Sequence, residues 1–482
     1  MAVSVLLSWR EGVSLGTGEG GSLRVEGPGS RLTFRRPSPA FASALGRLDA
    51  PGEEEDRLAG AIFEADGASG LPGWYYHLRS LDLRGWIVRS AWVDGRKLAS
   101  LIPTSADPSS GPAAVDLARP VVLSRFAYLR RSGGGAVLES PRAHARVVFD
   151  DPRAASIVGA LATPGDADEL ASRVEGLAPD AVAALLKLMA GAGMVGEAGP
   201  DGPEEGPSLK TWEFHDLLFH ARSRKGRTDG PSGATYRFAG IDPPPPALGP
   251  ESAGDSIALD RPDLERLGRE DPPLSAVVEA RRSIREYDDR PIDSRQLGEF
   301  LYRVARVTGR REIEVETPVG PLTMEFAYRP YPSGGALYEL EFYLAINRAG
   351  GLEPGLYRYE AGSHRLRRVA GRTAEVEHLL SDGAASAGIP PDRVQVLIIL
   401  AARFARLAWK YESIAYALIL KHVGAAYQTM YLAATAMGLA PCALGGGDSD
   451  RFARAAGTDS DSETSVGEFL LGSDPAGRST KT

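Results

Sequence analysis

Hydrophobic residues recur in the N-terminal half of the chain in two stretches that follow the same order. Each stretch opens on a short apolar strand, LTF at 32–34 or VVF at 147–149, and a proline follows three residues later. Because proline suits the first position of a helix, each strand is expected to lead into one. Two more helical patterns follow, and each stretch closes on a glycine and an apolar strand at 85–88 or 193–195. Strand, three helices and strand is the outline of a winged helix, and the repeat indicates a duplication.

The C-terminal half shows a different, α+β pattern. Helical spacing of apolar residues predicts helices over 274–282, 297–304 and 414–437, and apolar runs predict strands over 339–346 and 394–401. The strand at 394–401 is expected to be buried on both faces. The long helix at 414–437 is apolar nearly all round, so it belongs in a large core or a dimer interface.

Composition marks the joints between these parts. Residues 196–207, GEAGPDGPEEGP, are typical of a flexible linker, and 243–246 form a stiff polyproline tether. Between them, 209–227 is expected to be an amphipathic helix that ends in a basic run. We therefore expect four parts, namely winged-helix-like modules at 1–110 and 111–196, a linker with a lead-in helix at 197–262, and an α+β domain at 263–482.

Length, charge and cysteine use narrow the functional class. A chain of 482 residues exceeds one ordinary core and suits roughly two to four domains. The net charge of −8 argues against a general nucleic-acid binder, which is usually basic. Cys442 is the single cysteine, so no internal disulfide can form, and a catalytic thiol there is the weaker alternative. We expect a cytoplasmic protein without a membrane partner, because neither a signal-peptide pattern nor a long apolar run is present.

One short segment has the composition of a phosphate site. Arg281, Arg282, Ser283 and Arg285 are placed at an expected helix start, where Arg281 and Arg285 would share the i, i+4 face. Arginine forks and the unpaired backbone N–H groups of a helix N-terminus both suit a phosphate. The alternative interpretation is a solvated, charged turn.

Two glycine-rich turns add candidate contacts for a flat ligand. The turn PSGG at 332–335 follows a strand-like stretch, and LGGG at 444–447 lies beyond the end of the long helix. Glycine lets backbone approach a flat ligand because it has no Cβ. A hairpin turn and a helix C-cap are the respective alternatives. A phosphate site together with two such turns indicates a planar, phosphorylated cofactor, and FMN fits best. The expected ring contacts are Pro332, Ser333, Gly334, Gly445 and Gly446.

Lys410 and Tyr411 lie just before the long helix and form a compact acid/base candidate. Desolvated lysines and tyrosines can both exchange protons with a ligand, so either can be the base beside a flavin. A surface lysine and a packed tyrosine are the alternative. The residues expected to support the pair are Glu412, Tyr416 and His422. The histidines without metal-ligand spacing to cysteine or carboxylates are His215, His220, His364 and His378. We therefore expect no metal site.

These motifs, in this order, resemble the SagB-type dehydrogenases, the azoline oxidases of the FMN-dependent nitroreductase superfamily. The matching sequences are RRSIREYDDRPI at 281–292, YPSGGALYELEFYLA at 331–345, GLYRYEAGSHRLRRV at 355–369 and the stretch from WKYES to LGGG at 409–447. The lead-in sequence WEFHDLLFHARSR at 212–224 is similar as well. The resemblance covers residues 209–472, a little over half of the chain, and four ordered motifs make it specific.

The resemblance implies an α+β domain with a mixed or antiparallel sheet flanked by helices, and a homodimer with FMN at its interface. It implies that thiazoline or oxazoline rings of a ribosomally made precursor peptide become thiazoles or oxazoles, with dioxygen reoxidising the flavin. By motif, Lys410 and Tyr411 become the catalytic pair. The phosphate and ribityl contacts become Arg281, Arg282, Ser283 and Arg285. The N-terminal modules resemble elements that bind the precursor's leader or a partner cyclodehydratase.

Two other functions stay open beside this one. A small-molecule reductase would use NAD(P)H to reduce quinones or nitro compounds, and the Lys-Tyr pair and the long N-terminal extension argue against it. A non-catalytic peptide-binding scaffold is disfavoured because the arginine segment and both glycine turns are intact.

Overall fold

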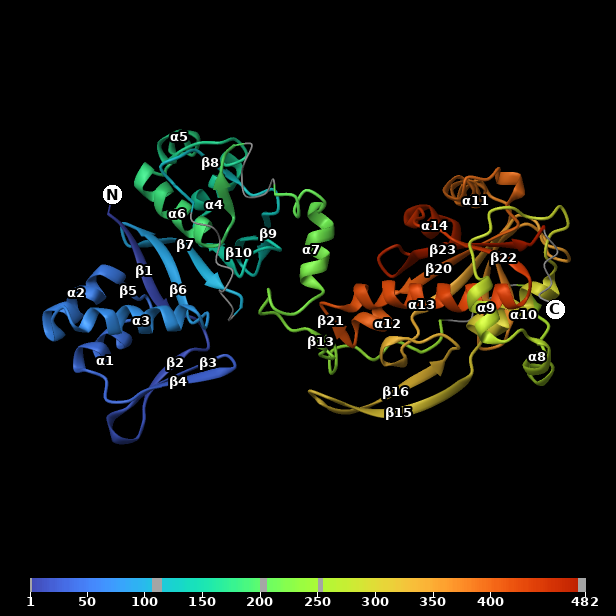
Figure 1. Ribbon diagram of the computed structural model, residues 1–482, viewed down its shortest axis with the longest axis horizontal. Coiled ribbons are helices and arrows are strands. Elements are labelled where there is room, and N and C mark those ends of the chain that lie inside the picture. Colours follow the sequence, from blue (N-terminus) through green and yellow to red (C-terminus); the bar gives the residue numbers. More distant parts are fainter. Residues whose placement is uncertain (1, 106–114, 200–205, 250–254, 476–482) are drawn as a thin grey trace. The chain divides into compact units, whose positions relative to one another are not determined.

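The computed structural model describes residues 2–105, 115–199, 206–249 and 255–475. The chain forms two compact units, Met1–Gly230 and Pro231–Thr482, and Figure 1 traces both. Part of the expected linker, 200–205, and the start of the second expected module, 111–114, lie outside the described residues. Among the helices that are described, none combines the length and the apolar character that crossing a membrane requires.

Within its described residues, the N-terminal unit is built on a seven-stranded antiparallel sheet. In spatial order the strands are β5 (Glu53–Glu54), β1 (Val3–Trp9), β6 (Ile87–Val93), β7 (Arg96–Pro103), β11 (Ala145–Phe149), β10 (Gly135–Glu139) and β9 (Tyr128–Ser132). Beside it are a three-stranded sheet of β2 (Ser14–Thr17), β3 (Leu23–Gly27) and β4 (Ser30–Phe34), and the pair of β8 (Val121–Leu123) with β12 (Val195–Glu197).

Three helices follow β4 and three follow β11. They are α1 (Pro39–Gly46), α2 (Glu55–Asp66) and α3 (Gly70–Asp82), then α4 (Pro152–Ala160), α5 (Ala167–Arg173) and α6 (Pro179–Gly191). Both sets begin alike, because Ser38 and Asp151 cap the first helix with a side-chain oxygen and a proline takes its first position. The predicted order of strand and three helices is confirmed in both stretches.

The lead-in helix is shorter than its hydrophobic pattern predicted. The pattern predicted a helix over 209–227, whereas α7 spans only Phe214–Arg222. Before it, the Thr211 hydroxyl donates to the Ser208 carbonyl, and after it the Ser223 hydroxyl donates to the His220 carbonyl. Short polar side chains that bond to nearby backbone compete with helix extension, which explains both limits.

The C-terminal unit is built on a second seven-stranded sheet, in which each described pair of neighbours is antiparallel. In spatial order its strands are β14 (Ser256–Ala258), β19 (Arg365–Ala370), β18 (Gly355–Glu360), β17 (Leu340–Ile346), β20 (Val396–Arg403), β23 (Glu463–Ser473) and β22 (Leu439–Ala443). The smaller described elements are α8 (Leu264–Glu270), α9 (Leu274–Ala280), α12 (Phe404–Ala408), the hairpin β15 (Gly309–Thr317) with β16 (Gly320–Tyr328), and the pair β13 (Gly233–Ala234) with β21 (Tyr411–Glu412).

Helices cover both faces of this sheet, as Figure 1 shows. The cores on the two faces are separate: α10 (Ser294–Ala305) and α13 (Ala415–Ala436) pack on one, α11 (Ala374–Ala387) and α14 (Ser449–Ala456) on the other. Along β17, Phe342 and Leu344 enter the first core and Tyr343 enters the second, as strand alternation requires. The predicted burial of the 394–401 strand on both faces is confirmed, and α13 matches the predicted long helix to within a residue at each end.

Candidate active site

The PSGG turn connects β16 to β17 and lies against α13. It is not a hairpin turn, because β16 pairs with β15 and β17 pairs with β18 and β20. Gly335 has a φ of +61°. A Cβ at Gly335 would lie 2.8 Å from both Lys410 Nζ and Tyr411 Oη. The structure therefore brings this turn together with the predicted acid/base pair.

Lys410 and Tyr411 are held between α12 and α13. Tyr411 belongs to β21, whose backbone pairs with Ala234 in β13. The Lys410 ammonium lies 5.4 Å from the ring centre of Tyr236 and 5.5 Å from that of Tyr411. Within the part of the chain that the structure describes, no carboxylate forms an ion pair with Lys410. Its cation is thus held by ring faces and stays available to a ligand.

The three residues expected to support the pair differ in their contacts. Glu412 accepts a hydrogen bond of 3.0 Å from the Thr235 hydroxyl. Tyr416 packs with its ring 6.3 Å from that of Phe404. His422 bonds the PSGG turn itself, because its Nε2 accepts from the Gly334 backbone N–H at 2.6 Å. Of the three, His422 is the one that the structure links to the turn by a direct hydrogen bond.

The arginine segment is not at a helix start, so the predicted i, i+4 face is wrong. Arg281 is the residue after the last turn of α9, and the backbone from Arg282 on is neither helix nor strand. The Ile284 N–H donates to the Pro441 carbonyl at the edge of β22. This bond takes up a backbone donor that a helix would use internally, and the segment runs along the sheet instead.

Tyr431 of α13 organises this segment and was missed by sequence reasoning. Its hydroxyl accepts from the Ala443 N–H at 2.8 Å and lies 2.7 Å from Ser283 Oγ. A phenolic oxygen has one proton and two lone pairs, so Tyr431 can accept from Ala443 and still either donate to Ser283 or accept from it. Arg281 lies over the Tyr431 ring at 5.2 Å from its centre. Tyr431 therefore orients both a hydroxyl and a guanidinium.

The arginines of this segment have no acidic partner in the described ranges. The ion pairs found there leave out Arg281, Arg282 and Arg285, whereas arginines elsewhere in the unit, such as Arg303 and Arg403, pair with carboxylates. Arg282 and Arg285 are exposed and Arg281 is partly buried. Unpaired guanidinium groups beside a hydroxyl donor form a suitable site for an anion.

The second glycine turn follows β22 and packs against β23. Nothing lies within 4 Å of a Cβ built at Gly445 or Gly446, so both face open space. At Gly447 a Cβ would collide with the Glu468 carboxyl. Burial raises the pKa of that carboxyl above its ordinary value of 4.5. Glu468 is a second residue that sequence reasoning missed.

Cys442 is not placed as a nucleophile. Its side chain is 1% exposed in β22. Burial raises the pKa of the thiol above 9.0. Because the thiolate is the reactive form, a buried thiol with a raised pKa argues against the catalytic alternative.

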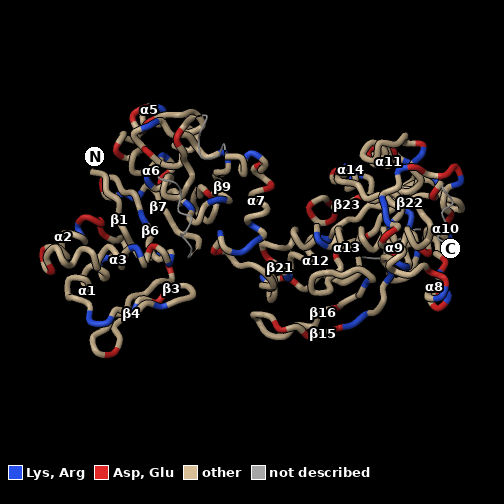
Figure 2. The backbone as a smooth tube through the Cα atoms, viewed as in Figure 1, with Lys and Arg blue, Asp and Glu red and all other residues tan. Residues whose placement is uncertain are grey.

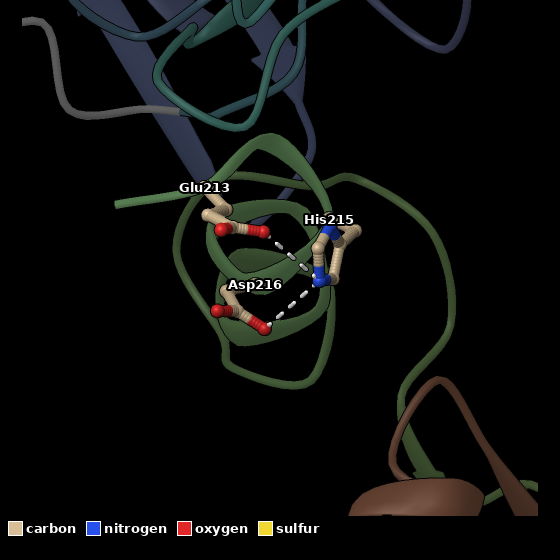
Figure 3. A group of neighbouring side chains, drawn as sticks. All are labelled: Glu213, His215 and Asp216. Carbon is tan, nitrogen blue, oxygen red and sulfur yellow. Dashed lines mark ion pairs between the residues drawn. The ribbon is translucent and has the colours of Figure 1, made fainter. Parts of the chain in front are cut away.

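One exposed group outside this site could hold a cation by geometry alone. Glu213, His215 and Asp216 at the start of α7 have ligand atoms within 4.8 Å of one another, as Figure 3 shows. His215 Nε2 lies 3.6 Å from Glu213 and 3.5 Å from Asp216, and all three side chains are more than 60% exposed. Exposed ion pairs of this kind are common on protein surfaces and make no site on their own.

A polar cavity in the N-terminal unit is lined by carboxylates that already form ion pairs with arginines. It is lined by β9 to β11 and by the chain after α7. There Glu139 pairs with Arg130, and Asp229 pairs with Arg10 and Arg146. Figure 2 shows acidic and basic residues interspersed along this unit. Because these carboxylates are already paired with arginines, the cavity is not a candidate for the chemistry.

Family models match the chain in three consecutive regions. A model described as the ThcOx helix turn helix domain matches 1–109, one described as cyanobactin oxidase ThcOx matches 121–229, and the nitroreductase family matches 278–473. A Methanocaldococcus jannaschii protein that is named as a nitroreductase is 30% identical to this chain over 195 residues. These residues make up 40% of this chain and 85% of that protein. The chain belongs to the nitroreductase family, and its N-terminal half is similar to the two ThcOx models.

The chain thus has an N-terminal region that matches a helix-turn-helix domain and a C-terminal nitroreductase-like domain. The predicted α+β fold class and the predicted family are confirmed. Nitroreductases typically bind FMN. Among solved structures, a Ralstonia eutropha nitroreductase is 19% identical to this chain with a TM-score of 0.34. The aligned part is 48% of this chain and 96% of that one. A chain of the Escherichia coli microcin synthetase McbBCD complex is 21% identical with a TM-score of 0.33, and the aligned part is 53% of this chain and 90% of that one.

Proposed function

We propose that this oxidase uses bound FMN to convert thiazoline or oxazoline rings of a precursor peptide to thiazoles or oxazoles. The observation that carries the proposal is the contact of the Gly335 turn with Lys410 Nζ and Tyr411 Oη. It sets two proton-exchanging groups against a glycine backbone that a flat cofactor can approach. Dioxygen is the terminal oxidant in this proposal.

The residues along α13 fit FMN at both of its ends. His422 contacts the PSGG turn and Tyr431 contacts the arginine segment, and the nine-residue separation between them along the helix spans about 14 Å. A planar ring at the first position and a phosphate at the second would occupy that length. The residues proposed to hold the phosphate and ribityl chain are Arg281, Arg282, Ser283 and Arg285. Those proposed to hold the ring are Pro332, Ser333, Gly334, Gly445 and Gly446.

Lys410 and Tyr411 are proposed to manage the proton of the reaction. The azoline ring loses two hydrogens, one from carbon as a proton and one with its electron pair. Tyr411, as a phenolate that the Lys410 ammonium stabilises, takes the proton and becomes a phenol. Bound FMN would supply the acceptor for the hydride, and dioxygen would then take up the two electrons. Aromatisation of the ring makes the overall step favourable.

Recognition of the peptide is assigned to the N-terminal unit, since none of the candidate site residues lies there. Its winged-helix-like modules are proposed to bind the precursor's leader or a partner cyclodehydratase. The oxidase is further proposed to act as a homodimer. The exposed residues Tyr416 and Leu420, one turn apart on α13, support this assignment, because exposed apolar side chains on a long core helix suit a second subunit.

The test is the visible spectrum of the purified protein, followed by anaerobic mixing with an azoline-containing peptide. Flavin peaks that bleach while the peptide loses two mass units would establish the activity. Lys410→Ala and Tyr411→Phe are expected to keep the yellow flavin and lower turnover at least about 100-fold.

Other outcomes point elsewhere. Flavin that stays oxidised with peptide and bleaches with NADPH would identify a small-molecule reductase. Protein that holds no FMN would support a peptide-binding scaffold. Colourless Lys410 and Tyr411 variants would mean that these residues hold the cofactor or the fold rather than the proton.

A further inference from the structure

We propose that the buried pair Glu339–His422 positions the PSGG turn, and through it the alignment of the reacting ring with Lys410 and Tyr411. His422 is thereby a positioning residue and not a catalytic one. The inference deepens the proposed function and rests on it for its kinetic consequences. The structural part, that this pair holds the turn, stands on geometry alone.

The turn is strained and therefore needs to be held. Left-handed backbone angles occur at Gly335, the last residue of the turn, with a φ of +61°, and just after it at Ala336 (+55°) and Tyr338 (+49°). Gly335 tolerates such an angle, whereas each residue with a Cβ costs about 1 kcal/mol or more there. A backbone of this kind persists only where neighbouring groups fix it. Its position against Lys410 and Tyr411 makes the fixation relevant to the chemistry.

The hydrogen bonds of His422 have a defined direction. The Gly334 N–H can only donate, so His422 Nε2 is its acceptor at 2.6 Å and carries no proton. The proton of the neutral ring then lies on Nδ1, which donates to Glu339 Oε1 at 2.7 Å. Glu339 is fully buried and His422 is 5% exposed. The chain from carboxylate to imidazole to backbone N–H thus fixes both the tautomer and the turn.

Glu339 also reaches the second residue of the turn, Ser333. Its second oxygen, Oε2, lies 3.4 Å from the Ser333 hydroxyl, and Ser333 Oγ accepts from the Tyr338 N–H at 3.0 Å. One carboxylate therefore contacts the turn at Ser333 directly and at Gly334 through His422. Arg406 adds a bond from its Nε to the Leu337 carbonyl at 3.0 Å. Among these groups, His422 is the one that bonds the backbone next to Gly335.

The experiment compares His422→Phe, His422→Gln and Glu339→Gln in the full-length protein. Phe fills the space and cannot accept from Gly334, whereas the Gln carbonyl can. We expect His422→Phe to retain FMN through the arginine segment and to lose kcat on the order of 10- to 100-fold at little-changed KM. His422→Gln should restore most of the turnover, and Glu339→Gln should fall between the two. Deuterium exchange over 331–339 should accelerate in His422→Phe.

His364→Gln is the matched control. His364 is 3% exposed and uses both ring nitrogens, at 2.8 Å from the Tyr359 hydroxyl and 3.0 Å from the Asp260 carbonyl. This control should lower Tm without changing kcat or exchange in the turn. If all the variants lost kcat in proportion to Tm, or if His422→Phe kept the wild-type kcat, the inference would be overturned.

The two proposals fail separately. A wild-type protein without azoline turnover would refute the proposed function and leave the positioning of the turn to be judged by exchange. Unchanged exchange over 331–339 in His422→Phe would then refute the positioning as well.

Discussion

Single residues on α13 connect the parts of the site that are far apart in the sequence. Tyr431 contacts Ser283 and Ala443, and its ring supports Arg281. These bonds hold the Ser283 hydroxyl and the Arg281 guanidinium in place on one side of α13. The proposed phosphate site thus depends on a residue with no charge of its own.

Removing this hydroxyl tests the arrangement. Tyr431→Phe keeps the ring under Arg281 and leaves the Ala443 N–H without its partner, so FMN affinity should fall about five- to tenfold. Titration of the apoprotein with FMN, followed by quenching of flavin fluorescence, measures the change. Tyr357→Phe is the control, since the Tyr357 hydroxyl donates to the Glu353 carbonyl in another part of the unit. Equal affinities in wild type and Tyr431→Phe would show that Ser283 needs no orientation.

Sequence reasoning found the polar motifs but could not find Tyr431 or Glu339. Tyr431 stands 148 residues from Ser283, and Glu339 stands 83 residues from His422. Within the sequence, each of them has the local pattern of a core residue. Their roles come from tertiary hydrogen bonds, which local periodicity does not encode.

The PSGG turn is the element in which backbone conformation and chemistry meet. Gly335 requires its positive φ, and its missing Cβ leaves room for Lys410 Nζ and Tyr411 Oη. These are two separate demands on one glycine. A second glycine of the unit, Gly388 at the end of α11, has a φ of +71° and nothing within 4 Å of a built Cβ.

Alanine at the two glycines separates strain from contact. Gly335→Ala and Gly388→Ala should each cost about 1 kcal/mol of stability, because alanine resists a left-handed φ. Only Gly335→Ala should also lower kcat, about tenfold or more, since its methyl group displaces the acid/base pair. Denaturant unfolding and steady-state kinetics on both variants decide the matter. Equal kinetics would place Gly335 among residues of purely structural importance.

Helices and strands could be predicted from the sequence where one hydrophobic pattern runs through the whole segment. The all-round apolar helix α13 and the doubly buried strand β20 followed from their hydrophobic runs. The arginine segment did not, because its course is set by the bond from Ile284 to Pro441, a partner more than 150 residues away. A charged run after a helix is compatible with a new helix or with an extended backbone. Here the tertiary hydrogen bond to Pro441 selects the extended backbone.

At the scale of the whole molecule, the proposed function divides peptide recognition from chemistry. Every candidate site residue lies in the C-terminal unit, which has its own two cores. In the N-terminal unit, β7 of the first expected module pairs with β11 of the second, so both modules contribute to one sheet. The alternation within a strand could not reveal this, because it does not specify the pairing partner.

Both modules keep a free strand edge among the described strands. In the first module β4 has β3 as its one partner, and in the second β9 has β10 as its one partner. An unpaired edge offers N–H and C=O groups to an extended peptide, so each module has an edge that suits the proposed leader.

Substrates with and without a leader test this division in the intact protein. If the N-terminal unit binds the leader, removing it raises KM at least about tenfold and leaves kcat nearly unchanged, because only uniform binding is lost. Adding the leader as a separate peptide would not rescue the leaderless substrate, since its gain depends on covalent linkage that raises the effective concentration of the azoline ring. Equal kcat/KM for the two substrates would instead mean that the N-terminal unit binds a partner enzyme and not the leader. Rescue by the free leader would mean that the leader activates the oxidation site and does not act by tethering the substrate.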